Sequence, residues 1–163
     1  MDLPGSAYLY TVAMLAMTFV GFCAVVLVLR QARAGKPTKL QLMHGHGYIE
    51  VAISAVAAAM LPPLLAVCGL SELRVWQWSS ATIAVGLTAY TAYILNAFHK
   101  LSHARIPTYV LINQLVTALV ILLLIGNVFG ITSPPNIGPV AIAATWRLTM
   151  AVAIFFCTLE ELF

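Results

Sequence analysis

Charged residues are scarce in this 163-residue chain, and their scarcity excludes most soluble folds. Only 8% of the residues are Asp, Glu, Lys or Arg, whereas 62% are hydrophobic; soluble domains carry about 25% charged residues. A soluble core of this size cannot absorb so many apolar side chains, so we predict a protein of the lipid bilayer. The net charge of +3 does not indicate nucleic-acid binding, because the basic residues cluster where membrane topology would place them.

Catalytic motifs and paired cysteines are also missing. The sequence has no P-loop, GxGxxG, GxSxG or HExxH motif, and Asp2 is its only aspartate, which excludes an intramembrane aspartate pair. Cys23, Cys68 and Cys157 stand singly in three apolar segments, where free cysteine is commonly a small buried hydrophobe. The first four residues lack a basic segment, so we expect no cleaved signal peptide. We predict no enzymatic activity and no cofactor.

Apolar runs of about 20 residues, the length that crosses a bilayer as a helix, recur along the chain. They predict one transmembrane helical domain over residues 1–163, an all-α polytopic integral membrane bundle with spans at about 6–29, 47–70, 75–98, 108–130 and 138–159. Pro62 and Pro63 should bend or break the outer part of the second span, because they lack backbone N–H groups. Arg147, near the middle of the last run, would cost about 2.5 to 3.5 kcal/mol on insertion. An alternative therefore has four spans and a re-entrant or interfacial C-terminal helix.

The distribution of basic residues favours one orientation in the membrane. The segments after the first and third spans share one side and hold six of the eight Lys and Arg residues: Arg30, Arg33, Lys36, Lys39, Lys100 and Arg105. The opposite side has only Arg74. Because basic loops stay in the cytoplasm, we predict an external N-terminus and a cytoplasmic C-terminus, in the plasma (inner) membrane of a prokaryote.

Small residues mark candidate helix-packing surfaces. In the third span they recur at every fourth position and lead to an amide, in the order Ser80, Ala84, Thr88, Ala92 and Asn96. The fourth span ends in a GxxxG pattern formed by Gly126 and Gly130. Small side chains let helices approach closely, so these patterns favour a tight bundle over isolated membrane anchors.

Polar side chains inside apolar spans are costly and indicate either function or specific packing. Glu50 lies about one turn into the second span, and the amides of Asn96, Asn113 and Gln114 fall at similar distances from the same predicted cytoplasmic surface. The carboxylate is suited to binding an ion, accepting a proton or pairing with Arg147 or a loop arginine. Structural roles also fit these residues: a Glu50 side chain that reaches the interface, amides that bond across helices, and an Arg147 held in a structural ion pair.

Four histidines form a rival set near the same surface: His44, His46, His99 and His103. His99 and His103 are spaced i, i+4, as are His46 and Glu50, and this spacing suits two ligands of zinc, copper or iron. Interfacial histidines beside Lys and Arg are often merely solvated. Metal binding is therefore retained only as an alternative.

These observations support three functional hypotheses. The first is a small homo-oligomer that conducts, transports or senses a small ion or proton through the polar residues of the inner half, because a pore needs several helices around a polar lumen. The second is an accessory or structural subunit of a membrane complex without transport chemistry of its own. The third is a membrane redox protein with a histidine-ligated metal. In each case the lipid bilayer is the expected partner, and nucleic acid is not.

Overall fold

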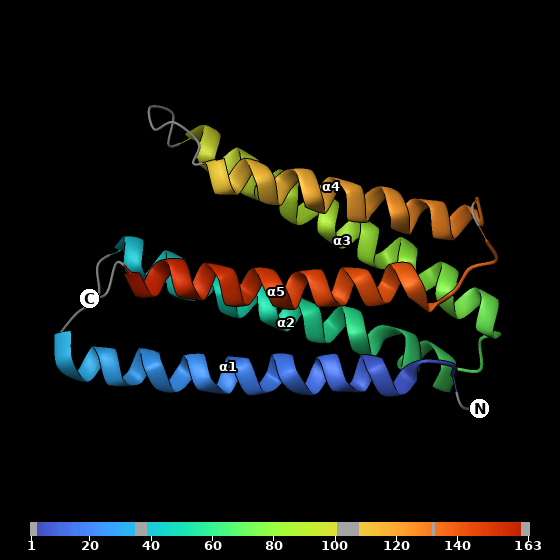
Figure 1. Ribbon diagram of the computed structural model, residues 1–163, viewed down its shortest axis with the longest axis horizontal. Coiled ribbons are helices and arrows are strands. Elements are labelled where there is room, and N and C mark those ends of the chain that lie inside the picture. The colour runs from blue at the N-terminus through green and yellow to red at the C-terminus, as the bar shows by residue number, and fades with distance from the viewer. Residues whose placement is uncertain (1–2, 35–38, 101–107, 132, 161–163) are drawn as a thin grey trace. The chain divides into compact units, whose positions relative to one another are not determined.

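Five α-helices make up the described part of the chain (Figure 1). The computed structural model describes residues 3–34, 39–100, 108–131 and 133–160, with side chains for 3–29, 47–96, 111–131 and 133–157. The helices are α1 (Ser6–Ala34), α2 (Lys39–Val67), α3 (Glu72–Lys100), α4 (Thr108–Phe129) and α5 (Ile137–Glu160). None of the described residues forms a strand, which confirms the prediction of an all-helical protein.

Four of the described helices are long and apolar enough to cross a membrane, over Ser6–Leu29, Gly47–Val67, Leu111–Phe129 and Ile137–Cys157. These lengths are compatible with an integral membrane location. The alternative from the sequence had a C-terminal helix that does not span the membrane, but α5 is among these four helices and α3 is not. With 29 residues, α3 is about 43 Å long. Its polarity, not its length, therefore distinguishes it from the others.

Helix α2 differs in two ways from the predicted second span. It begins at Lys39 rather than near residue 47, because the helix continues from the apolar run into the polar sequence before it. It also remains helical through Pro62 and Pro63, so the expected break is absent. Both prolines are buried, and packing around a buried helix offsets the missing backbone hydrogen bonds.

The chain divides into two compact units, which are described separately. Residues Pro62–Ala143 form the α3/α4 unit, and Pro4–Leu61 with Ala144–Phe163 form the α1/α5 unit. The divisions fall within α2 and within α5, so each of these helices contributes to both units.

In the α3/α4 unit, α3 and α4 pack side by side (Figure 1). Gln77 Nε2 donates a hydrogen bond to the Val128 carbonyl over 3.2 Å, and Asn127 Nδ2 donates to Ser80 Oγ over 2.8 Å. Residue numbers rise on α3 as they fall on α4, so the two helices are antiparallel. The register is fixed near the end of α4, where these polar contacts gather.

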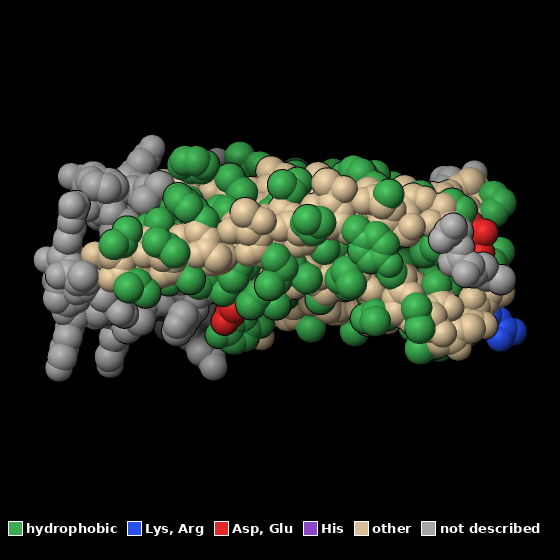
Figure 2. Space-filling model, turned by 90° about the horizontal axis from the view of Figure 1, so that it is seen from below, with side chains coloured by type: hydrophobic (Ala, Val, Ile, Leu, Met, Phe, Trp, Pro, Cys, Tyr) green, Lys and Arg blue, Asp and Glu red, His purple; other side chains and the backbone are tan. Residues whose placement is uncertain are grey.

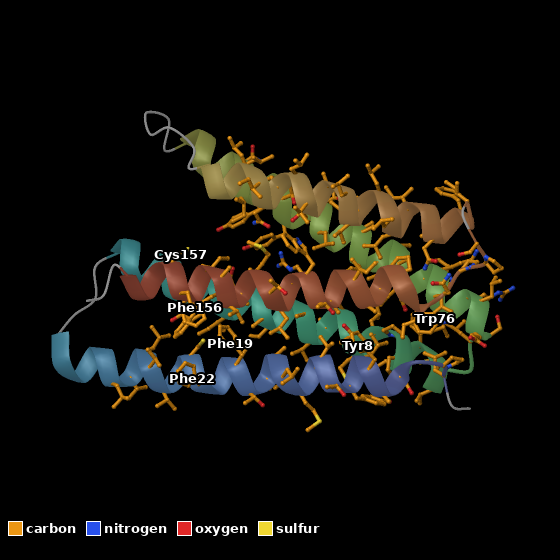
Figure 3. All side chains as sticks on the ribbon, in the orientation of Figure 1. Tyr8, Phe19, Phe22, Trp76, Phe156 and Cys157 are labelled. Atoms are coloured by element: carbon orange, nitrogen blue, oxygen red, sulfur yellow. The ribbon has the colours of Figure 1, made fainter. Side chains whose placement is uncertain are left out.

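In the α1/α5 unit, α1 runs parallel to α5 and α2 runs antiparallel to it. The hydroxyls of Tyr8 and Thr145 lie 2.6 Å apart, and the Phe19 and Phe155 ring centroids are 5.6 Å apart. Residue numbers therefore rise together on α1 and α5. Phe155 also packs edge-on against Tyr48, at 5.4 Å between centroids. Figure 3 labels Tyr8, Phe19 and Phe22 along α1, and Phe156 on α5.

Many large apolar side chains remain exposed on the chain. Met14 is 71% exposed, Val28 65%, Val85 70% and Phe129 75%. Figure 2 shows hydrophobic side chains spread along the face in view, with few acidic or basic side chains among them. An apolar surface of this extent suits contact with lipid or with other membrane helices rather than with water.

Candidate functional site

Arg147 is buried near the middle of α5, with 6% of its surface exposed. Its Nε donates a hydrogen bond to Ser54 Oγ on α2 over 2.7 Å. The Ser54 hydroxyl in turn donates to the Val51 carbonyl over 2.6 Å. The serine oxygen thus accepts from the arginine while its proton is held by the backbone. This contact explains in part how α5 accommodates a cation so far from either helix end.

Small side chains surround this contact on both helices. Ala52 and Ala55 on α2, and Ala144 and Ala151 on α5, are fully buried. Alanines allow two helices to approach closely. A short serine hydroxyl is therefore able to reach the guanidinium of the facing helix.

Glu50 lies one helical turn before Ser54 on α2, and its side chain is exposed. Within the described part of the chain it forms no hydrogen bond and no ion pair within 4.0 Å. Glu50 and Arg147 are nevertheless the only Asp, Glu, Lys or Arg residues of the α1/α5 unit whose side chains the structure describes. The ion pair considered from the sequence is thus not formed, because the buried guanidinium bonds to Ser54 while the carboxylate faces outward.

The three predicted amides all belong to the α3/α4 unit. Asn96 is exposed on α3, and Asn113 on α4 is half-buried and accepts a 3.4 Å hydrogen bond from Thr117 Oγ1. Gln114 is half-buried, yet its Oε1 is buried without a hydrogen-bond partner in the described structure. The structure therefore brings Glu50 and Arg147 into one unit and these amides into the other.

The predicted packing stripe of α3 has two different environments. Ser80 and Ala84 are buried, and Ser80 accepts the hydrogen bond from Asn127. Thr88 and Ala92 are exposed and line an open groove with Ala81, Ala84, Val128 and Phe129. The Thr88 hydroxyl donates to the Ala84 carbonyl over 2.8 Å, so the groove wall is apolar in character.

The GxxxG pattern at the end of α4 has a capping role at its second glycine. Gly130 has φ +62°, its N–H bonds to the Asn127 carbonyl, and the Ile131 N–H bonds to the Gly126 carbonyl. These two bonds define a Schellman motif, in which glycine ends the helix. A Cβ built at Gly126 meets no atom within 4 Å. Close helix packing on this pattern is therefore not present within the described chain.

Asn127 is the polar residue that sequence reasoning overlooked. It is 4% exposed, its Nδ2 donates to Ser80 Oγ and to the Asn136 carbonyl, and its Oδ1 accepts from the Asn136 N–H. The signal available in the sequence was an amide inside an apolar run. The GxxxG pattern of Gly126 and Gly130 around it indicates helix packing instead.

The histidine alternative falls outside the described side chains. His44, His46 and His99 lie on helices, but their side chains are among those not described, and His103 lies outside the described residues. Among the described side chains, no group of three or more His, Cys, Asp and Glu residues is placed to hold a metal ion.

The α1/α5 unit therefore presents an exposed carboxylate one helical turn from the serine to which a buried arginine is hydrogen-bonded. Such a carboxylate is suited to binding a proton or a cation, or to pairing with a cationic group of another chain. Comparison of the chain with family models, with curated proteins and with solved structures gives no match. A functional assignment consequently rests on the chemistry of these residues.

Proposed function

We propose that this chain is a subunit of a homo-oligomeric membrane protein that conducts, transports or senses a small ion or proton. Glu50 is the ion-binding group in this proposal, and Arg147 sets its electrostatic environment. The observation that carries it is the exposed Glu50 carboxylate, which lacks an ion pair in the described chain although a buried arginine binds one turn away.

Glu50 lies three residues after Gly47, where the sequence predicts the second span to begin, or about 4.5 Å along the helix. An ionised side chain in lipid is costly unless water, a cation or another chain compensates it. An exposed carboxylate at this level therefore favours contact with an ion pathway or with a neighbouring subunit. Five helices seldom enclose a pathway of their own, so conduction requires several copies of the chain.

We further propose that α3 crosses the bilayer, giving five spans. The support is the parallel arrangement of α1 and α5, fixed by the Tyr8–Thr145 and Phe19–Phe155 contacts. If α1, α2, α4 and α5 crossed and α3 did not, α5 would cross in the direction opposite to α1. Five crossings restore the parallel arrangement.

The orientation in this proposal has the N-terminus outside and the C-terminus in the cytoplasm. The basic segments after the first and third spans support it. The proposed location remains the plasma membrane of a prokaryote.

The decisive experiment measures flux through the purified protein in liposomes, with separate proton-gradient and potassium-gradient assays. Glu50→Gln keeps the side-chain size and removes the charge, so we expect flux to fall about tenfold or more with an unchanged melting temperature. Glu72→Gln is the matched control, because Glu72 is an exposed acid in the first turn of α3. Flux in the control should equal that of the native protein.

Unchanged flux in Glu50→Gln would contradict the role of this carboxylate. Absence of flux in the native protein under both gradients would instead favour an accessory subunit without transport chemistry. A specific observation supports that second candidate: Arg147 is buried and hydrogen-bonded to Ser54, and a structural role for the arginine needs no ion.

A further inference from the structure

Thr91 Oγ1 on α3 and Gln114 Oε1 on α4 are buried oxygens of the α3/α4 unit that have no hydrogen-bond partner in the described part of the chain. Burying a polar atom without a partner is unfavourable, and the bilayer core offers no water to compensate it. We infer that these two side chains form a binding site between α3 and α4 for a small ligand that offers positive charge to oxygen, either a water molecule or a monovalent cation. The site belongs to a different unit from Glu50, so this inference goes beyond the proposed function.

The register of the antiparallel helices α3 and α4, which pack side by side (Figure 1), places the two side chains at one level. Gln77 Nε2 on α3 donates a hydrogen bond to the Val128 carbonyl on α4 over 3.2 Å. Thr91 lies 14 residues after Gln77 on α3. Gln114 lies 14 residues before Val128 on α4. Each side chain is therefore about 21 Å along its helix from this hydrogen bond.

Both side chains also lie on the helix faces that line one open groove. Ala84 on α3 and Ile125 on α4 are lining residues of this groove. Thr91 lies seven residues, or about two turns, after Ala84 and so shares its face of α3. Gln114 lies 11 residues, or about three turns, before Ile125 and so shares its face of α4. The groove extends on α3 to Ala92, next to Thr91, and so gives a small ligand a path to the site.

The two oxygens determine which ligand fits. An amide oxygen only accepts hydrogen bonds, whereas a threonine hydroxyl both accepts and donates them. The two atoms are not hydrogen-bonded to each other, so a species between them that contacts both would satisfy both. Neutral oxygens of this kind bind buried water molecules, and they also replace part of the hydration shell of monovalent cations. The described side chains of residues 85–96 and 111–122 include no Asp, Glu, Lys or Arg, so an anion or a divalent cation has no opposite charge to hold it.

A stability cycle tests the site. Thr91→Val and Gln114→Met each remove one oxygen and keep the side-chain size. Each single variant should lower the melting temperature by about 2 °C or more, because the ligand loses a contact and the other oxygen is left unpaired. The double variant leaves neither oxygen, so it should recover at least about half of the summed losses. Thr88→Val is the matched control, because the exposed Thr88 hydroxyl bonds to the Ala84 carbonyl of its own helix; its melting temperature should change by less than about 1 °C.

The same melting temperatures, measured in NaCl, KCl and N-methylglucamine chloride at equal ionic strength, identify the ligand. A bound cation should raise the melting temperature of the native protein in NaCl or KCl, and Gln114→Met should abolish that rise. A bound water should give the same difference between native and variant protein in all three salts. Unchanged or higher melting temperatures in both single variants would overturn the site, because the oxygens would then be unpaired. The cycle needs no flux, so its failure is distinct from failure of the proposed function, which Glu50→Gln reports.

Discussion

Asn127 has hydrogen bonds at both of its amide protons and at its side-chain oxygen. Its two amide protons go to Ser80 Oγ at 2.8 Å and the Asn136 carbonyl at 3.0 Å, and its oxygen accepts the Asn136 N–H at 3.1 Å. The amide thus ties α4 to α3 and to the residue that precedes α5. Asn136 extends the connection by accepting the Gly138 N–H at its own side-chain oxygen.

Replacing this amide should destabilise the protein. Three hydrogen bonds at about 0.6 kcal/mol each, the mean found within membranes, predict a loss of about 2 kcal/mol for Asn127→Leu. The measurement is unfolding followed by helicity in lipid or detergent. Asn113→Leu is the control, because the Thr117–Asn113 hydrogen bond is long, at 3.4 Å, and half-buried. Equal stabilities of the two variants would contradict the importance of the Asn127 network.

At the scale of secondary structure, the GxxxG pattern at the end of α4 caps the helix. Gly130 has φ +62°, a conformation that L side chains adopt with strain, whereas Gly126 is helical with open space beside it. The Schellman hydrogen bonds then satisfy carbonyls that the last turn would leave unpaired. Capping rather than helix association accounts for the second glycine.

The two glycines should respond to alanine with opposite signs. Gly130→Ala should lose about 1 kcal/mol of stability, because a Cβ there has only ordinary contacts, with Ser133 O at 3.6 Å, and the loss comes from the backbone. Gly126→Ala should be neutral or gain up to about 1 kcal/mol, since alanine favours the helix. Unfolding measurements on both variants check this. A strong loss in Gly126→Ala would instead indicate that another helix packs against this glycine.

At the scale of the whole molecule, the direction of each helix constrains the membrane topology. The α1/α5 contacts require both helices to run the same way, and the Tyr48–Phe155 and Ser54–Arg147 contacts require α2 to run the opposite way. In the proposed five-span arrangement, α3 returns the chain across the bilayer before α4. The small and polar surface of α3 suits contact with protein more than contact with lipid.

Cysteine labelling tests this topology. In a variant without native cysteines, probes at Lys36→Cys and Ser102→Cys should react from the cytoplasm, and probes at Ser71→Cys and Ser133→Cys from outside. The pair that flanks α3 is decisive. Labelling of positions 71 and 102 from the same side would show that α3 does not cross, and would contradict the five-span arrangement.

Composition and local pattern were sufficient to predict the class of protein and the unusual residues. Apolar runs of span length require helices, because every backbone group must be hydrogen-bonded within the segment in lipid. A glutamate and an arginine inside such runs are visible without a structure, and so is the i, i+4 spacing of Glu50 and Ser54 on one helix face. These features are local, and they depend only on residue type and helical periodicity.

Contacts between distant residues were decided by the tertiary structure alone. Ser54 and Arg147 are 93 residues apart, and helical periodicity carries no information about which helix lies beside α2 or in what register. The hydrogen bond between them therefore depends on how α2 and α5 pack against each other. The parallel direction of α1 and α5 likewise follows from two contacts between them, Tyr8–Thr145 and Phe19–Phe155, which no single helix determines.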